Sequence, residues 1–295
     1  GQSIKEVGPT WHKGKQGTPT MGGLMFIIGI GIAILILGWK GMLEGNFTHL
    51  YVYVFALVFG VIGYIDDYQK VKHHQNTGLT APQKFLLQLA AAVAFLCLMR
   101  YEGMLSPNLY IPFFNTHLVL PWVVYMIFAA FVIIGTVNAV NITDGVDGLS
   151  AGLAVVSIGT FLLAYGEELG DYSTAAVVFI GALLAYLWSN AKPSSLLMGD
   201  AGSRAMGFFI AILSLKCGHP FAFLLAAIVF IVDGSLGILK ISLKRFLHIS
   251  ILKNTRTPLH DHVRKNKGWS DEQVVARWLI LQSVASALLL LLVRG

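Results

Sequence analysis

The 295-residue chain is predicted to be an all-α polytopic membrane protein, and its composition and its apolar segments both lead to that fold class. Apolar residues make up 56% of the sequence and charged residues 12%, and the mean hydropathy is +0.70. A soluble domain usually carries about twice that share of charge. The two cysteines lie in or beside apolar runs and suggest no disulfide framework. Because no linker divides the chain, we expect residues 1–295 to form a single membrane domain.

About nine segments can cross a bilayer, since a spanning helix needs about 20 mostly apolar residues. Gly218 and Pro220 favour a tight turn between the seventh and eighth segments. Residues 103–117, between the third and fourth, alternate weakly and predict a small external hairpin. In chain order the segments are 20–38, 50–65, 84–102, 118–140, 149–166, 172–189, 203–217, 219–243 and 272–293.

The basic residues are distributed unevenly over the loops between these segments. With residues 1–19 on one side and strict alternation afterwards, 17 of the 21 Lys and Arg residues fall on that first side. Cytoplasmic loops of membrane proteins carry the excess of positive charge, so this side is predicted to face the cytoplasm. The net charge of +6 then suits anionic lipids and phosphates, and it does not require a nucleic-acid partner.

The same alternation puts every conspicuous polar motif on the predicted cytoplasmic side, although only Lys and Arg were used to assign it. Asp and Asn at helix ends are often solvated or serve as N-caps, but a cap needs only one oxygen. NITDGVDGL supplies several oxygens together with two flexible glycines, which allow close backbone approach to a ligand. The motifs are GYIDDYQK (63–70), NAVNITDGVDGL (138–149), SNAKPSSLLMGDAGS (189–203) and TPLHDH (257–262).

Five carboxylates in these motifs are expected to converge on one membrane face. Crowded carboxylates repel one another and shift toward their neutral forms. A hard divalent cation held by one or two carboxylates and by substrate phosphates would relieve the repulsion, and Mg²⁺ fits that description. Zinc fits less well, because His260 and His262 are the only candidate nitrogen ligands close together. The five carboxylates are Asp66, Asp67, Asp144, Asp147 and Asp200.

Two further features leave alternatives open. KQGTPTMGG (15–23) precedes the first apolar segment, and a loop–helix junction of this kind can present backbone N–H groups to an anion. It lacks the lysine spacing of a P-loop. Asp233 lies within an apolar segment, where an acid is costly and often functional. It could face the carboxylate cluster, although a structural polar contact is the favoured interpretation.

Five motifs in this order resemble the phospho-N-acetylmuramoyl-pentapeptide transferases, within the polyprenyl-phosphate N-acetylhexosamine 1-phosphate transferases. The motifs are GTPTMGG, DDYQK, NAVNITDGVDGL, LLMGDAGS and PLHDH, and the resemblance covers nearly the whole chain. It implies transfer of phospho-MurNAc-pentapeptide from UDP-MurNAc-pentapeptide to undecaprenyl phosphate, with Mg²⁺ as cofactor and lipid I and UMP as products. It further implies a bacterial inner-membrane protein whose active site faces the cytoplasm, and it allows a homodimer.

The resemblance also implies roles for particular residues. The catalytic set would be Asp66, Asp67, Asp144, Asp200 and His260, with Asp200 as the Mg²⁺ ligand. Asp147, Asn190 and Lys15 would hold the uridine, and Lys70, Lys84 and His260 would meet phosphates. The whole set of substrate-binding residues is Lys15, Thr20, Lys70, Lys84, Asn138, Asn141, Asp147, Asn190 and His262, of which Asn138 and Asn141 are alternatives at the centre itself.

Three departures from the family pattern stand out. The family has ten spans, so the chain is expected to lack the first. Asp261 replaces the middle one of three consecutive histidines, which leaves His260 and His262. Arg204 follows GDAGS where an apolar residue is common, and no role is assigned to it.

Two alternatives to the transferase remain. A UDP-GlcNAc-using sibling would share the aspartates but need not share TPTMGG or PLHDH. A transporter could use Asp233, but it would place its polar residues near the bilayer midplane.

Overall fold

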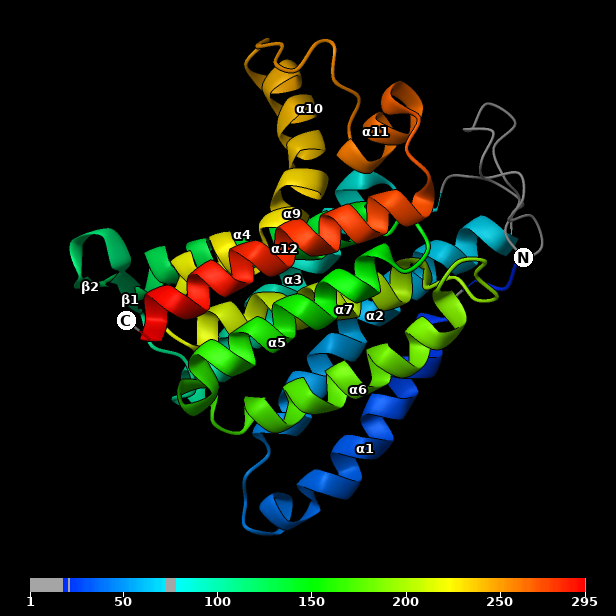
Figure 1. Ribbon diagram of the computed structural model, residues 1–295. Helices are drawn as coiled ribbons and strands as arrows, with labels where there is room; N and C mark the ends of the chain where they lie inside the picture. The colour runs from blue at the N-terminus through cyan, green and yellow to red at the C-terminus, as the bar shows by residue number, and fades with distance from the viewer. Residues whose placement is uncertain (1–17, 21, 73–77, 295) are drawn as a thin grey trace.

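The computed structural model describes residues 18–20, 22–72 and 78–294, and it is built almost entirely of helices (Figure 1). Short 3₁₀ turns lie at Pro112–Phe114 and Pro220–Ala222, and Ile231–Ser235 forms a π-helical turn. The main elements are α1 (Gly23–Leu43), α2 (Thr48–Lys72), α3 (Ala81–Tyr101), β1 (Asn108–Ile111), β2 (Thr116–Val119), α4 (Trp122–Thr143), α5 (Leu149–Leu169), α6 (Tyr172–Asn190), α7 (Gly199–Lys216), α8 (Phe223–Ala226), α9 (Ile228–Phe230), α10 (Leu236–Phe246), α11 (Leu259–Lys267) and α12 (Asp271–Arg294).

Helices stand at all nine positions where the sequence predicts membrane segments, and the all-α polytopic membrane class is confirmed. In the described part of the chain, α1 to α6 and α12 are long and apolar enough to cross a membrane. Pro220–Ala226 and Ile228–Phe246 form a pair bent by 80°, which would make an eighth span. Beyond this bend, α10 projects away from the other helices (Figure 1). The remaining predicted segment, 203–217, lies within α7, which carries three charged residues.

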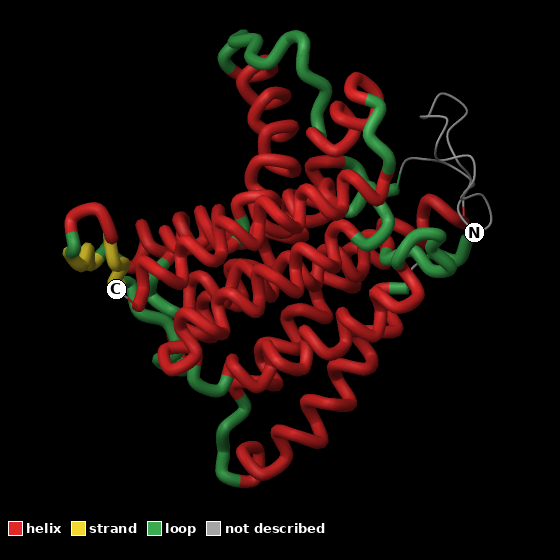
Figure 2. The backbone as a smooth tube through the Cα atoms, in the orientation of Figure 1, coloured by secondary structure: helices red, strands yellow, loops and turns green. Residues whose placement is uncertain are grey.

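The predicted hairpin is present between the third and fourth spans. Strands β1 and β2 pair antiparallel, with Asn108 opposite Val119 and Ile111 opposite Thr116. Asn115 closes the connection in a left-handed backbone conformation, with a φ of 45°. The strand β2 extends two residues into the segment expected to span from 118, because α4 begins only after Pro121. The hairpin lies at one end of the helix bundle (Figure 2).

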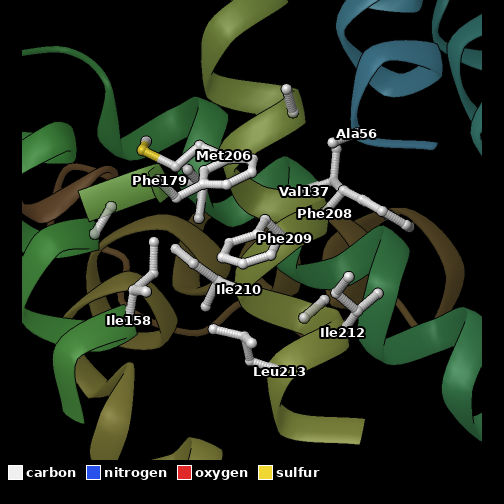
Figure 3. Packing of buried hydrophobic residues seen from close by; sticks show 14 of the residues in the cluster. Ala56, Val137, Ile158, Phe179, Met206, Phe208, Phe209, Ile210, Ile212 and Leu213 are labelled. Carbon is white, nitrogen blue, oxygen red and sulfur yellow. The ribbon is translucent and has the colours of Figure 1, made fainter. Parts of the chain in front are cut away.

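Helix α7 forms the centre of the core. Every residue from Ala201 to Leu215 is buried, and α1, α2, α4 and α5 all pack against it. The ring of Phe209 stacks on Phe179 of α6, with ring centroids 3.9 Å apart (Figure 3). Phe208 stacks on Phe59 of α2, with ring centroids 4.8 Å apart.

Glycines let the backbones of α2 and α4 approach α7 closely. A Cβ atom on Gly63 of α2 would overlap the backbone carbonyl of Asp200, and one on Gly207 of α7 would lie 2.7 Å from the Cα of Val137. Small residues are favoured at such contacts because lipid supplies no hydrophobic force between helices, so close packing must hold them together. The approach at Gly63 brings the end of α2 to the start of α7.

We therefore expect Gly63→Ala to destabilise the protein through overpacking, which typically costs about 1–3 kcal/mol. Gly159→Ala on α5 is a matched control, because nothing lies within 4 Å of its added Cβ. Both changes gain the same helix propensity, so the difference between their melting temperatures in detergent isolates the packing term. Equal melting temperatures would contradict the close contact at Gly63.

Candidate active site

Three carboxylates, two of them buried and that of Asp200 partly exposed, meet where α2 ends and α7 begins. Asp66 and Asp67 lie near the end of α2, and Asp200 lies in the first turn of α7. Carboxylate oxygens of all three lie within 4.8 Å of one another. The backbone N–H of Asp200 donates to Oδ2 of Asp67 at 2.6 Å. The N-terminal end of α7 therefore points a backbone N–H group at Asp67.

Three basic side chains neutralise this cluster among the described residues. Lys70 Nζ lies 2.7 Å from Asp66 Oδ2 and 3.1 Å from oxygens of both Asp67 and Asp200. Lys84 Nζ lies 2.8 Å from Asp66 Oδ2, and an Arg204 Nη2 atom lies 3.3 Å from Asp200 Oδ2. The repulsion expected from the sequence is therefore relieved within the chain itself.

A polar cavity of about 220 Å³ opens beside the carboxylates. Eight of the predicted site residues lie on its wall, and they come from the N-terminal segment, α2, the end of α4, the α4–α5 turn, the end of α6 and the start of α7. The lining residues are Thr20, Asp67, Lys70, Asn141, Asp144, Gly145, Val146, Asp147, Asn190, Leu197, Gly199 and Asp200.

The two aspartates of α2 differ in their relation to this cavity. Asp67 lines it, whereas Asp66 lies behind it and is fully buried. Oδ1 of Asp66 accepts the backbone N–H of Leu79 at 2.7 Å, and Oδ2 pairs with Lys70 and Lys84. Asp66 therefore joins α2 to the start of α3 and holds both lysines.

The two asparagines that the sequence left open are also placed differently. Asn141 lines the cavity, and its Nδ2 donates to Asp200 Oδ1 at 2.9 Å. Asn138 lies one turn earlier on α4, where it donates to Gln88 Oε1 at 2.8 Å and accepts from Arg204. Gln88 carries no motif, so the sequence offered no signal for its part in this network.

Hydrogen bonds between loops hold the far wall of the cavity in shape. Asn190 Oδ1 accepts the N–H of Gly148 at 2.8 Å, and its Nδ2 donates to the carbonyl of Leu196 at 2.8 Å. The N–H groups of Gly22 and Gly23 donate to the carbonyls of Leu197 and Met198. These two amides of the 15–23 segment therefore bind backbone oxygens of the loop before α7.

Asp233 makes structural polar contacts and does not join the carboxylate cluster. Its oxygens accept the N–H of His260 at 2.7 Å and the indole N–H of Trp278 at 3.3 Å, and Oδ2 lies 2.7 Å from His260 Nδ1. A carboxylate that holds Nδ1 fixes the ring and its tautomer. The other ring nitrogen, Nε2, lies so close to Gly145 on the cavity wall that a Cβ there would overlap it.

Besides Asp66, Asn138 and His260, two further predicted site residues are off the cavity wall. His262 lies elsewhere on α11, and its Nδ1 accepts the backbone N–H of Arg256 at 3.2 Å. Lys84 reaches only Asp66, behind the cavity. Lys15 lies outside the described residues.

The buried acidic cluster could hold a metal ion. All of its candidate donors are carboxylate oxygens, which are the ligands that hard divalent cations prefer. Asp67 and Asp200 both face the cavity, so a cation held by them could also reach a bound phosphate. The donor set therefore fits Mg²⁺ or a similar ion.

The comparisons with known proteins agree with this site. Residues 49–218, from α2 to α7, match the family model of glycosyl transferase family 4. Residues 15–27 match signature 1 of phospho-N-acetylmuramoyl-pentapeptide-transferases. The protein of that name from Lacticaseibacillus paracasei is 36% identical over 289 residues, which cover 95% of this chain and 86% of the relative. Those from Listeria welshimeri and Latilactobacillus sakei are 37% and 35% identical, over 93% and 99% of this chain and 84% and 89% of theirs. The chain therefore belongs to the phospho-N-acetylmuramoyl-pentapeptide-transferase family.

Proposed function

We propose that this protein transfers phospho-MurNAc-pentapeptide from UDP-MurNAc-pentapeptide to undecaprenyl phosphate, forming lipid I and UMP. The name shared by its relatives supports the reaction class. The observation that carries the proposal is the cluster of three carboxylates at a polar cavity, with Asp67, Asp200 and Lys70 on the cavity wall. The enclosure of α7 by four other helices further supports a single membrane domain over residues 1–295.

The reaction needs little covalent chemistry from the protein. An oxygen of the lipid phosphate forms a bond to the β-phosphorus of the nucleotide, and the bond from that phosphorus to the bridging oxygen breaks. UMP leaves with the bridging oxygen and the electron pair. Catalysis of such a transfer comes mainly from positioning and from neutralising charge.

Asp200 is the proposed ligand for Mg²⁺. When bound, Mg²⁺ would neutralise charge on the diphosphate and on the transferring phosphoryl group. The ammonium of Lys70 lies on the cavity wall between the same carboxylates, so it can contact phosphate oxygens there.

Asp67 is the proposed base or nucleophile toward the lipid phosphate. It faces the cavity, whereas both oxygens of Asp66 are occupied by partners behind the wall. We assign Asp66 to holding Lys70 and Lys84 in position. His260 would meet a phosphate at the rim beside Gly145, with its ring oriented by Asp233.

The other end of the cavity is the proposed uridine site. Asp147 and Asn190 line the cavity, and carboxylate and amide groups can recognise the hydrogen-bonding edge of a base, whereas Asp144 remains a proposed catalytic residue. Lys15 remains a proposed uridine contact. His262 lies off the wall, so its proposed role in substrate binding has less support.

A transfer assay with purified protein tests this function. The protein is incubated with undecaprenyl phosphate, Mg²⁺ and radiolabelled UDP-MurNAc-pentapeptide or UDP-GlcNAc. We expect label to enter the lipid fraction, with release of UMP, only from the first nucleotide. Transfer only from UDP-GlcNAc would support the sibling enzyme, and transfer from neither would contradict the proposal.

The proposed location is the bacterial inner membrane, with the cavity facing the cytoplasm. The excess of Lys and Arg on the loops at that side supports it. In a Cys97→Ser background, we expect Lys265→Cys on α11 to resist a membrane-impermeant thiol reagent in intact cells. Thr116→Cys should react, because the hairpin is predicted to be external. Residues 116 and 265 are both exposed in the structure, so a difference in their labelling reports the side of the membrane on which each lies. Labelling at 265 with the membrane intact would invert the topology.

A further inference from the structure

Arg204 is a buried charge that no step of the proposed reaction uses. It lies on α7 one turn after Asp200, and only 2% of its surface is exposed. An Nη2 atom lies 3.3 Å from Asp200 Oδ2, and Nη1 donates to Asn138 Oδ1 at 3.4 Å. A buried cation is costly unless it is paired. Arg204 does not line the cavity, and of its two partners, Asp200 and Asn138, Asp200 is the one on the cavity wall.

Asp200 is already bound by cations and donors of the chain on both oxygens. Its Oδ2 atom is shared by Arg204 and Lys70, and its Oδ1 accepts from Asn141. A divalent cation that binds Asp200 must therefore approach two positive charges. Two like charges a few ångströms apart repel strongly in a medium of low dielectric constant.

The two positive charges differ in their freedom to move. Lys70 has a flexible side chain on the cavity wall and can turn toward a phosphate. Arg204 is enclosed in the core, and Asn138, its amide partner, is itself held by Gln88 Oε1 and the carbonyl of Ile134, both at 2.8 Å. The guanidinium is therefore a fixed charge beside the metal ligand.

We propose that Arg204 is a positioning residue that lowers the affinity of Asp200 for a divalent cation, so that the cation binds well only together with the diphosphate of the nucleotide. The inference rests on the proposed function, which supplies the diphosphate. Two negative phosphates added to the cavity would offset the fixed positive charge. Arg204, a side chain outside the cavity, would then make binding of the cation depend on binding of the nucleotide.

The test measures binding of Mn²⁺, as a substitute for Mg²⁺, to the purified full chain in detergent by the electron paramagnetic resonance of free Mn²⁺. Arg204→Gln and Arg204→Leu remove the charge, and Arg204→Lys keeps it. Arg100→Leu is the control for a change in net charge, because Arg100 is an exposed residue near the far end of α3. Melting temperature and gel filtration establish that each variant is folded.

Without nucleotide, we expect the Gln and Leu variants to bind Mn²⁺ about tenfold tighter than the wild type, and the Lys and Arg100 variants to match it. With saturating UDP, the tenfold difference should fall to less than about threefold. A protein-free sample with UDP corrects for Mn²⁺ that UDP itself binds. A structural role alone would predict weaker binding in the variants, because Asp200 would lose a partner. Weaker or unchanged binding in both folded neutral variants would overturn the proposal, as would a difference that UDP does not reduce. Failure of the transfer assay would instead overturn the proposed function, because Mn²⁺ binding is measured without turnover.

Discussion

Asp67→Asn is expected to lower turnover by about 10²–10⁴-fold, the range typical for loss of a general base. The amide has nearly the same shape as the carboxylate but cannot accept a proton or attack phosphorus. Because Asp200 and Arg204 remain in place, affinity for Mg²⁺ and for UMP should stay near that of the wild type. Turnover is measured by the transfer assay, and the two affinities are measured by calorimetry.

Two further variants separate this effect from a general loss of charge. Asp171→Asn makes the same change at the N-terminal end of α6, whereas Asn190 of the cavity lies at the C-terminal end of that helix. We expect it to leave turnover unchanged. Asp66→Asn should mainly lower the melting temperature, because it removes the carboxylate that pairs with Lys84 and one of the three that pair with Lys70. Near-normal turnover in Asp67→Asn would remove Asp67 from the chemistry, and a stable but inactive Asp66→Asn would favour Asp66 in its place.

Asp200→Asn is expected to weaken Mg²⁺ binding by about 10- to 100-fold, which corresponds to the roughly 1.5–3 kcal/mol typical of an interaction with a charged group. Its phenotype should differ from that of Asp67→Asn, because added Mg²⁺ should partly restore turnover. The measurement is the dependence of transfer rate on Mg²⁺ concentration. Near-normal activity at ordinary Mg²⁺ would contradict the metal assignment.

The same substitution leaves Arg204 as a buried cation with one fewer partner. We therefore expect Asp200→Asn to lower the melting temperature as well. The double variant Asp200→Asn/Arg204→Gln should recover stability without recovering Mg²⁺ affinity. This variant separates a defect in metal binding from a defect in folding. If the double variant regained normal Mg²⁺ affinity, Asp200 would not be the principal ligand.

The fold class and the positions of the helices could be predicted from the sequence because they depend on local hydropathy. A stretch such as 149–166 must be helical in lipid, since each backbone polar group has to find its partner within the segment. The hairpin was predicted for the same local reason, from weak alternation and turn residues. The aspartates and asparagines could be singled out because polar residues at the ends of apolar segments are conspicuous.

Contacts between helices could not be predicted from local pattern. The pairing of Asp233 with His260 joins residues 27 positions apart, and that of Asp67 with the N–H of Asp200 joins residues 133 positions apart. Tertiary packing also decided that Asn141, and not Asn138, lines the cavity, because the pitch of α4 turns only one of them toward Asp200.

The sequence by itself therefore determined a helical membrane protein with its polar motifs at the ends of apolar segments. The tertiary structure decided which acids meet, which of them faces the cavity and what Arg204 contacts. The physical reason is the distance along the chain over which each effect acts. Hydropathy acts over the length of one helix, whereas the site depends on how closely two backbones approach, as α2 and α7 do at Gly63.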